Sequence, residues 1–178
     1  ATLDGLKNTS NPNDLVKEKI NSLSDFVDRS ILELKNTLWV LHSETVFLED
    51  LQLKITNLIS SISEAKPELQ IKFQFEIKEN LSLDSKTAAQ IFRVVQEILN
   101  NVLKHSGADL AELNFTQNAD ILLMHISDNG IGFDPESQKN KSFGLTNIET
   151  RIHDISGSVH VNSRIGSGTF YTLQIPLR

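Results

Sequence analysis

The sequence predicts an α+β fold, a two-layer α/β sandwich in which helices cover one face of a mixed sheet, preceded by a long helical segment. Two observations lead to this prediction. Apolar residues recur at helical spacing over the front of the chain, whereas after Pro67 short segments of alternating apolar and polar residues are separated by single helices. The expected order after Pro67, β-α-β-β-loop-α-β-β, offers few parallel crossovers, and it therefore favours a mixed sheet.

The front of the chain is expected to be helical. Its run Asn-Pro-Asn-Asp at 11–14 is typical of a helix start, because it supplies a capping side chain, a proline for the first turn and an acidic residue near the positive end of the helix dipole. Apolar residues then recur at spacings of three and four as far as Leu41, which predicts a helix of roughly 30 residues with a seam for packing against another helix. A second helix is expected over 47–64 and ends before Pro67.

The middle of the chain alternates between strands and one helix. Residues 71–78 alternate strictly between apolar and polar side chains, which predicts a half-buried strand. Asp84 is expected to cap a helix over about 85–105 that carries an apolar stripe. Two strands are expected next, at 110–117 and 121–127, joined by a short turn.

The last third of the chain starts with a loop. Residues 129–143 are polar and show no period, so no regular element is expected there. A helix is expected over 145–155, with Gly157 just past its end as a C-cap, and the final segments 158–164 and 169–177 predict a hairpin.

The composition excludes several classes of function. The 178 residues carry a formal net charge of −6, which does not favour broad electrostatic binding to nucleic acid or to an anionic membrane. The chain has no cysteine, so it forms no disulfide and no thiolate metal site. No apolar run approaches the roughly 20 residues that a membrane helix needs, and the polar N-terminus shows no signal peptide. Because the chain lacks an initiator methionine, it is expected to be a piece of a longer protein.

One face of the helix expected over 85–105 carries a polar row. Glu97 and Asn101 are four residues apart and so share a face, and Lys104 and His105 lie one turn further on. A carboxylate and an amide in such a row can hold Mg²⁺ through oxygen, and the two basic residues can add positive charge near phosphates. A solvated helix face is the alternative, and the row by itself favours that alternative.

A second cluster comes directly after the strand expected at 121–127. Asp128 can accept a hydrogen bond from a donor such as an exocyclic amine, while Gly130 and Gly132 let a ligand approach the backbone closely. A β-hairpin turn is the alternative. The next residues along the chain do not form a strand pattern, so a simple hairpin fits poorly.

Two further glycine positions complete the set. Gly144 precedes a predicted helix, and a helix N-terminus behind a glycine is a ready anion site. Gly168 and Thr169 stand beside the last strand, where the threonine hydroxyl could contact a base directly or through water. Alone, this pair is typical of a common hairpin.

The order and spacing of these motifs resemble the nucleotide-binding GHKL or Bergerat fold, which sensor histidine kinases share with gyrase-type ATPases. The segment FRVVQEILNNVLKHS resembles the Asn-box of the histidine-kinase sub-class related to nitrate sensors and the fatty-acid desaturase sensor. DNGIGFD and SFGLTNIETRI resemble its two glycine boxes, and GSGTFYTLQIPL resembles its closing hairpin. The resemblance covers about 68–178.

The front of the chain resembles the second helix of a dimerisation hairpin and its linker. Its portion Leu-Lys-x-Thr-Leu-Trp is especially similar to propeller-type two-component sensors of Bacteroidetes. The resemblance therefore divides the chain into a dimerisation and linker segment at 1–66 and a catalytic ATP-binding domain at 67–178. It implies the cytoplasmic part of an inner-membrane bacterial sensor kinase, without direct membrane contact and without a nucleic-acid partner.

The resemblance also implies that the domain binds ATP together with Mg²⁺. Asp128 would accept from the adenine amine with Thr169 nearby. Asn101 would bind Mg²⁺, and Glu97 would lie near the water shell of the metal or act as a base towards the acceptor imidazole. The implied ATP-binding residues are Asn101, Lys104, His105, Asp128, Gly130, Gly132, Gly144, Leu145, Gly168 and Thr169, and the implied catalytic and metal-binding pair is Glu97 and Asn101.

No histidine of this chain stands in the setting of a phospho-acceptor, which kinases of this kind carry on the first hairpin helix. His42 is followed by serine, and His153 falls in the helix after the second glycine box. We therefore expect the γ-phosphate to pass to a histidine that this chain does not contain. The resemblance implies three partners besides ATP: the acceptor helix, a second subunit and a response regulator.

Three alternatives stay open. The chain could be a degenerate module that senses nucleotide without phosphotransfer, although the intact Glu97 and Asn101 argue against this. An anti-sigma-factor serine kinase of the same fold is disfavoured by the helical front end. A gyrase- or chaperone-type ATPase is disfavoured by the short loop after Asp128 and by the lack of a following transducer domain.

Overall fold

The computed structural model describes residues 45–77, 82–134 and 143–177. By its contacts the chain divides into two compact units, residues 1–42 and Ser43–Arg178. All of the described residues belong to the second unit. The helix expected from residue 11 to about residue 42 lies outside the described residues.

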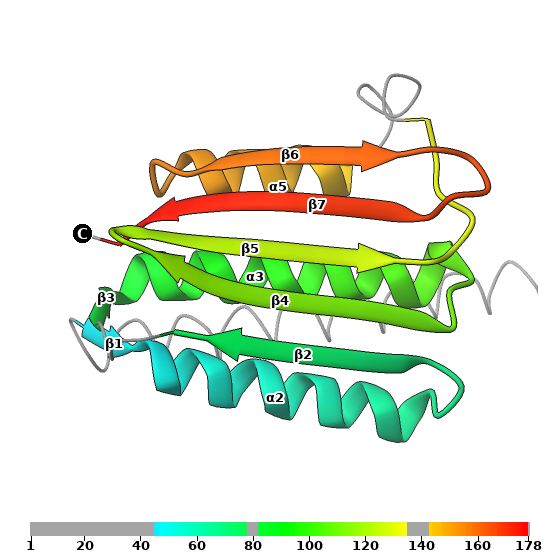
Figure 1. Cartoon of the computed structure of the whole chain (residues 1–178), viewed down its shortest axis with the longest axis horizontal. Helices are drawn as coiled ribbons and strands as arrows, with labels where there is room; N and C mark the ends of the chain where they lie inside the picture. Colours follow the sequence, from blue (N-terminus) through cyan, green and yellow to red (C-terminus); the bar gives the residue numbers. More distant parts are fainter. Residues whose placement is uncertain (1–44, 78–81, 135–142, 178) are drawn as a thin grey trace, which may run out of the picture. The chain divides into compact units, whose positions relative to one another are not determined.

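The described residues form a five-stranded mixed sheet with the strand order β2-β4-β5-β7-β6 (Figure 1). β2 runs parallel to β4, and every other neighbouring pair is antiparallel. The predicted mixed sheet is therefore confirmed. The strands are β2 (Gln70–Glu76), β4 (Leu110–Asn118), β5 (Ile121–Asp128), β6 (Ser158–Ser163) and β7 (Thr169–Pro176).

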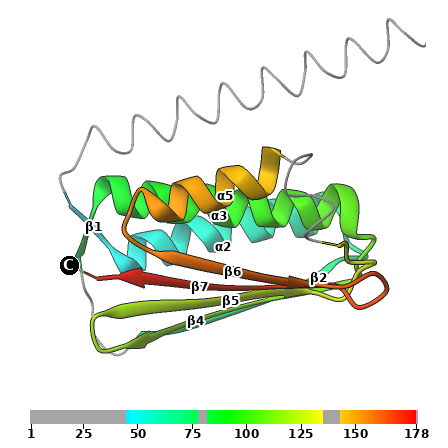
Figure 2. The same cartoon turned by 90° about the horizontal axis from the view of Figure 1, so that it is seen from above.

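Three helices cover one face of this sheet, which gives the predicted two-layer sandwich (Figure 2). They are α2 (Leu48–Ala65), α3 (Ser85–Asn101) and α5 (Phe143–His153). α3 packs against both other helices. Its apolar stripe is buried, and Asp84 caps its first turn as predicted, with its carboxylate 2.9 Å from the Thr87 backbone nitrogen.

The core lies between the helices and the inner face of the sheet. The register places Leu113 of β4, Ile126 of β5 and Tyr171 of β7 side by side across three strands, and all three are buried. Because side chains alternate along a strand, Asp128 and Thr169 lie on this same inner face, two residues beyond Ile126 and two before Tyr171. The inner face thus changes from apolar to polar at one end of the sheet.

Some local structure differs from the prediction. β1 (Thr45–Phe47) and β3 (Ser82–Asp84) form a small antiparallel sheet that was not predicted, because three residues are too few to show a period. The helix predicted over 85–105 becomes a π-helical segment, η1 (Val102–Ser106), after Asn101. The helix predicted over 145–155 begins and ends two residues earlier, as α5.

α2 belongs to the same compact unit as the sheet, since it packs on α3 and β2. The expected division of the chain after residue 66, into a dimerisation and linker segment and a catalytic domain, concerns the roles of these parts in a longer kinase. It stays a prediction. Within the described ranges, no helix combines the length and apolar character that crossing a membrane requires.

Candidate functional site

Asp128 ends β5 and pairs with Thr169, the first residue of β7. Its carboxylate accepts a hydrogen bond from the Gly130 backbone nitrogen at 2.9 Å and further hydrogen bonds from Thr169. Partial burial raises the pKa of Asp128, and the hydrogen bonds from Gly130 and Thr169 oppose that rise. The result is a partly desolvated acceptor that its neighbours hold in one orientation.

The loop after β5 lies so close to its neighbours that two of its residues must be glycine. A Cβ on Gly130 would collide with the backbone of Ser106 at the end of η1. Gly132 has φ +59°, and a Cβ there would collide with the backbone carbonyls of Arg164 and Gly168. These glycines were predicted to allow close approach of a ligand. In the structure they allow close approach of the protein backbone itself.

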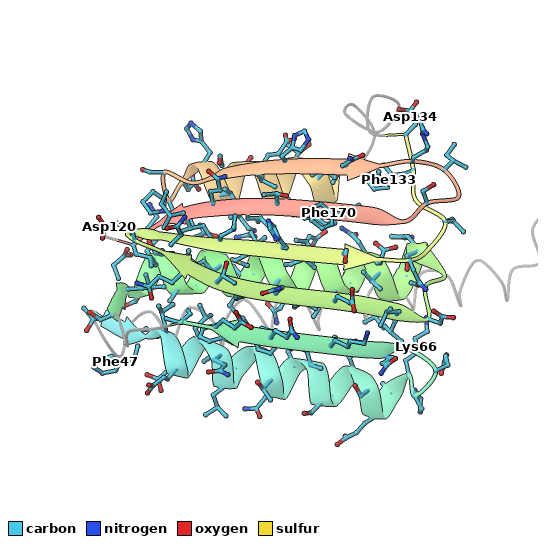
Figure 3. The ribbon with its side chains drawn as sticks, in the orientation of Figure 1. Phe47, Lys66, Asp120, Phe133, Asp134 and Phe170 are labelled. Carbon is cyan, nitrogen blue, oxygen red and sulfur yellow. The ribbon has the colours of Figure 1, made fainter. Side chains whose placement is uncertain are left out.

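Three hydrogen bonds fix the start of this loop. The Ile131 nitrogen donates to the Ser106 carbonyl at 2.8 Å, and the Ile131 carbonyl accepts from the Gly166 nitrogen at 2.6 Å. The Phe133 nitrogen donates to the Ser163 hydroxyl at 2.9 Å. Figure 3 shows Phe133 and Asp134 at the edge of the sheet where β5 and β6 end and β7 begins. Residues 131–133 are therefore attached both to the end of η1 and to the β6–β7 hairpin.

The surroundings of Asn129 show that Asp128-Asn129-Gly130 is not the turn of a simple β-hairpin. Its side-chain oxygen accepts from the Asp109 and Leu110 nitrogens at 3.2 and 3.1 Å, and its side-chain nitrogen donates to the Asp109 carboxylate at 2.6 Å. These bonds connect the end of β5 to the start of β4. The strand that pairs with β5 on its other side is β7, far along the chain, so Asp128-Asn129-Gly130 does not join two consecutive strands.

The polar row on α3 meets the start of α5. A Cβ on Gly144 would stand 2.8 Å from Oε1 of Glu97 and 3.5 and 3.6 Å from Nδ2 and Oδ1 of Asn101. Three residues that the sequence singled out separately thus lie together. The glycine therefore lets the first turn of α5 lie this close to the carboxylate without displacing the Glu97 side chain.

The sequence pattern of the histidine kinase-, DNA gyrase B- and HSP90-like ATPases matches residues 86–178, slightly more than half of the chain. The chain belongs to this ATPase family. The match begins with α3 and runs through the closing strand β7, so it includes every residue of the site described above.

Two curated relatives of the chain are named as a histidine-protein kinase/phosphatase and as a sensor protein. The chain is 33% identical over 114 residues to the signal transduction histidine-protein kinase/phosphatase DegS of Bacillus subtilis. This aligned segment makes up 61% of this chain and 30% of DegS. It is 29% identical over 164 residues to the sensor protein VraS of Staphylococcus epidermidis. This aligned segment makes up 91% of this chain and 45% of VraS. The chain thus spans less than half the length of either relative.

Solved structures share the fold of this family member. The histidine kinase domain of a blue-light activated kinase from Erythrobacter litoralis superposes with a TM-score of 0.60 at 21% identity, over 71% of this chain and 61% of that one. The histidine kinase AdeS of Acinetobacter baumannii superposes with a TM-score of 0.62 at 13% identity, over 98% and 89%. At these identities the likeness concerns the fold alone.

The remaining predicted residues of the ATPase site differ in their surroundings. Thr169 is buried and Leu145 is half-buried, whereas Lys104 and His105 lie exposed on η1. Gly168 has φ +73°, and a Cβ there would collide with the Asp128 carbonyl, so this glycine is required where β7 starts beside β5. Contact of Lys104 and His105 with phosphates stays a prediction.

The chemistry of Glu97 and Asn101 suits magnesium. Mg²⁺ prefers oxygen ligands and keeps part of its water shell, and it is held in many kinase-like sites by one or two protein side chains plus phosphate oxygens. One carboxylate and one amide match that donor set. No group of three or more histidine, cysteine, aspartate or glutamate side chains suited to a metal occurs in the parts of the chain that the structure describes.

One residue of the site was not predicted. Tyr171 of β7 is buried, and its hydroxyl group lies near the side chain of Asn101. Burial raises the pKa of Tyr171 well above its usual value, and the charge of Asp128 adds to this effect. The alternation of β7 could have placed Tyr171 on the same face as Thr169, but no motif pointed to a contact with Asn101.

Proposed function

We propose that this chain is the ATP-binding catalytic domain of a two-component sensor histidine kinase, and that it binds Mg-ATP to transfer the γ-phosphate to a histidine outside this chain. The observation that carries the proposal is the fixed Asp128 carboxylate at one end of the site, with Glu97, Asn101 and Gly144 grouped at the start of α5. The names of DegS and VraS support it.

In this proposal Asp128 recognises adenine. An exocyclic amine donates two hydrogen bonds and carries no lone pair for accepting, so a carboxylate suits it and a second donor would not. Asp128 already accepts from Gly130 and Thr169. Its other lone pairs are available for the amine, and Thr169 lies beside it for a direct or water-mediated contact with the ring.

The triphosphate would extend towards Asn101 and the first turn of α5. Free backbone N–H groups and the positive end of the helix dipole favour phosphate there. Asn101 would bind the cation through Oδ1, with Glu97 beside it. Magnesium, when bound, neutralises charge on the phosphate oxygens. The side-chain-free Gly144 leaves this space open.

The transfer itself requires in-line geometry more than covalent chemistry from the protein. The bond between the γ-phosphorus and the bridging oxygen breaks, a phosphorus–nitrogen bond to the acceptor imidazole forms, and ADP leaves. The imidazole proton passes to a base, and Glu97 is the carboxylate that we assign to this role.

Finer features of the proposal rest on the resemblance of the motifs. We infer the sub-class of nitrate and desaturase sensors and a likeness to propeller-type sensors, with residues 1–66 as dimerisation and linker segment. The same resemblance suggests an inner-membrane receptor, a second subunit and a response regulator as its context in the cell.

Phosphotransfer from γ-labelled ATP to a separate polypeptide that carries the acceptor helix tests the proposal. We expect an acid-labile phosphohistidine on the acceptor when this chain, ATP and Mg²⁺ are all present, and none with Glu97→Ala or Asn101→Ala. Nucleotide binding without any transfer would favour a degenerate sensing module. Acid-stable phosphoserine on a protein target would favour a serine kinase of the same fold.

A further inference from the structure

Ser163, the last residue of β6, makes hydrogen bonds that the proposed reaction does not use. Its hydroxyl group accepts from the Phe133 nitrogen at 2.9 Å and donates to the Gly168 carbonyl at 2.9 Å. The same oxygen lies 3.2 Å from the hydroxyl oxygen of Thr169. One half-buried hydroxyl group thus joins three segments: the loop after β5, the end of β6 and the start of β7.

The strand register places this hydroxyl group in line with the proposed adenine acceptor. Ser163 of β6 pairs with Thr169 of β7, and Thr169 pairs in turn with Asp128 of β5. Because directly paired residues point to the same face of a sheet, the three side chains form one row on the inner face. Thr169, the middle member, has an exposed fraction of only 6%, so its hydroxyl group needs partners within the protein or from a ligand.

The row holds two hydroxyl hydrogens and more than two acceptors for them. The hydrogen of Ser163 can go to the Gly168 carbonyl or to Thr169. The hydrogen of Thr169 can go to Ser163 or to the other side, where Asp128 lies. When Ser163 donates to Thr169, the hydrogen of Thr169 is therefore available on the side of Asp128. The Phe133 nitrogen donates to Ser163 in both arrangements, since a backbone nitrogen cannot accept.

The edge of adenine requires both an acceptor and a donor from the protein. Its exocyclic amine donates, whereas the ring nitrogen beside the amine carries a lone pair and accepts. The proposed function assigns Asp128 to the amine. An ionised carboxylate has no hydrogen to give, so the donor for the ring nitrogen has to come from a neighbour. Thr169 supplies a hydroxyl group directly beside Asp128 in the register.

We propose that Ser163 is a positioning residue for base recognition, which holds the Thr169 hydroxyl group beside Asp128 and turns its hydrogen towards the ring nitrogen of adenine, directly or through water. This inference rests on the proposed function, because it takes Asp128 and Thr169 as the adenine contacts. Ser163 itself contacts no part of the nucleotide. Its loss should therefore weaken recognition of the base and leave binding of the phosphates unchanged.

The alternative is that Ser163 only holds β6, β7 and the loop after β5 together. The two roles differ in their dependence on the base. Inosine diphosphate carries a carbonyl oxygen where ADP carries its amine, and the ionised Asp128 repels that oxygen, so the affinity of inosine diphosphate comes mainly from its phosphates. A positioning role predicts a loss of affinity for ADP alone, whereas a distorted site predicts similar losses for both nucleotides.

The test is calorimetric titration of the whole chain with ADP and with inosine diphosphate, both in Mg²⁺. Ser163→Ala should weaken ADP binding by roughly three- to tenfold, the value of one neutral hydrogen bond, and should leave binding of inosine diphosphate unchanged. Thr169→Val should weaken ADP binding at least as much. The double variant should bind ADP no more weakly than Thr169→Val alone, because Ser163 acts through that hydroxyl group.

Two further variants serve as controls. Ser163→Thr keeps the hydroxyl group, and threonine suits a strand, so this variant should bind ADP within about twofold of the parent. Thr87→Val removes a buried hydroxyl group that donates to Asp84 in the first turn of α3, whereas the loop after β5 meets the other end of that helix at Ser106. It should lower the melting temperature and leave the affinities for both nucleotides unchanged.

Equal weakening of ADP and inosine diphosphate binding by Ser163→Ala, or no weakening of either, would overturn the inference. A Ser163→Thr variant that binds ADP as weakly as Ser163→Ala would do the same. The proposed function fails separately if the parent chain binds both nucleotides equally well, because Asp128 then does not recognise the amine. Should Ser163→Ala not fold, Ser163→Cys offers only a weak donor and a weak acceptor at the same place. It should lose affinity for ADP alone, and equal losses would contradict the inference.

Discussion

Gly144 lies against Glu97 so closely that a Cβ on the glycine would stand 2.8 Å from Oε1 of the carboxylate. The two residues come from α5 and α3, and no local pattern in the chain indicates that they touch. Their contact brings the second glycine motif and the polar row of α3 into one site. The proposed phosphate end of the site depends on this meeting of two helices.

The first prediction concerns Gly144→Ala. The atom in the way is the end of a flexible side chain, so Glu97 can move aside, and alanine is preferred over glycine in a helix by about 0.5–1 kcal/mol. We expect an unchanged or slightly higher melting temperature together with a loss of phosphotransfer. A strongly destabilised variant would show that the first turn of α5 cannot tolerate any side chain.

The second prediction compares two glycines with positive φ in one hairpin. Gly166 has φ +82° and open space around it, whereas Gly168 has φ +73° and the Asp128 carbonyl in the way. Gly166→Ala should cost about 1 kcal/mol of unfolding free energy, from backbone strain alone. Gly168→Ala should cost at least about twice as much, because β7 must also move away from β5. Equal losses in denaturant titrations would contradict the close approach of the two strands.

The third prediction concerns the stability of Asp128→Asn without ligand. Burial raises the pKa of Asp128, so the native state binds its proton more tightly than the unfolded state does. The protonated carboxyl therefore adds to the free energy of unfolding at pH values below 3.8, its ordinary pKa. This contribution is lost as the pH rises through the higher pKa that Asp128 has in the folded state. At neutral pH the ionised Asp128 therefore disfavours folding, and Asp128→Asn should be as stable as the parent or more stable. A lower unfolding free energy at neutral pH would contradict this.

The neighbouring residue should behave in the opposite way. Asn129 accepts from two backbone nitrogens and donates to Asp109, but it has no place in the adenine contact. Asn129→Ala should lower the unfolding free energy by about 1–2 kcal/mol and leave nucleotide affinity unchanged at temperatures where the variant is folded. A reduced affinity of the folded variant would assign Asn129 to the binding site.

Much of the fold could be predicted because its signals are local. The alternation of β2, the Asp84 cap of α3 and the first residues of β4 and β5 each depend on neighbouring residues, and the structure confirms them. β1 and β3 could not be predicted, because strands of three residues show no period and form only by pairing with each other. The π-helical turn at η1 also escaped prediction, since its residues fit a helical pattern equally well.

The site was predictable in its residue types and not in its contacts. The resemblance indicated Glu97, Asn101, Asp128 and the glycines, but the partner of each depends on which strand lies beside which. Gly132 owes its small size to Arg164 and Gly168, residues of a hairpin much later in the chain. Tyr171 was overlooked for the same reason, because it lies on the last strand and its neighbour Asn101 lies on a helix in the other layer.

The measurement that tests the central claim most directly is the affinity of a non-hydrolysable ATP analogue for the parent chain and for Asp128→Asn, determined by calorimetry in Mg²⁺. A hydrogen bond to a charged acceptor contributes about 1.5–3 kcal/mol, so we predict that Asp128→Asn binds at least roughly tenfold more weakly while remaining folded. Equal affinity of the two proteins would contradict the assignment of Asp128 to adenine, and with it the placement of ATP in this site.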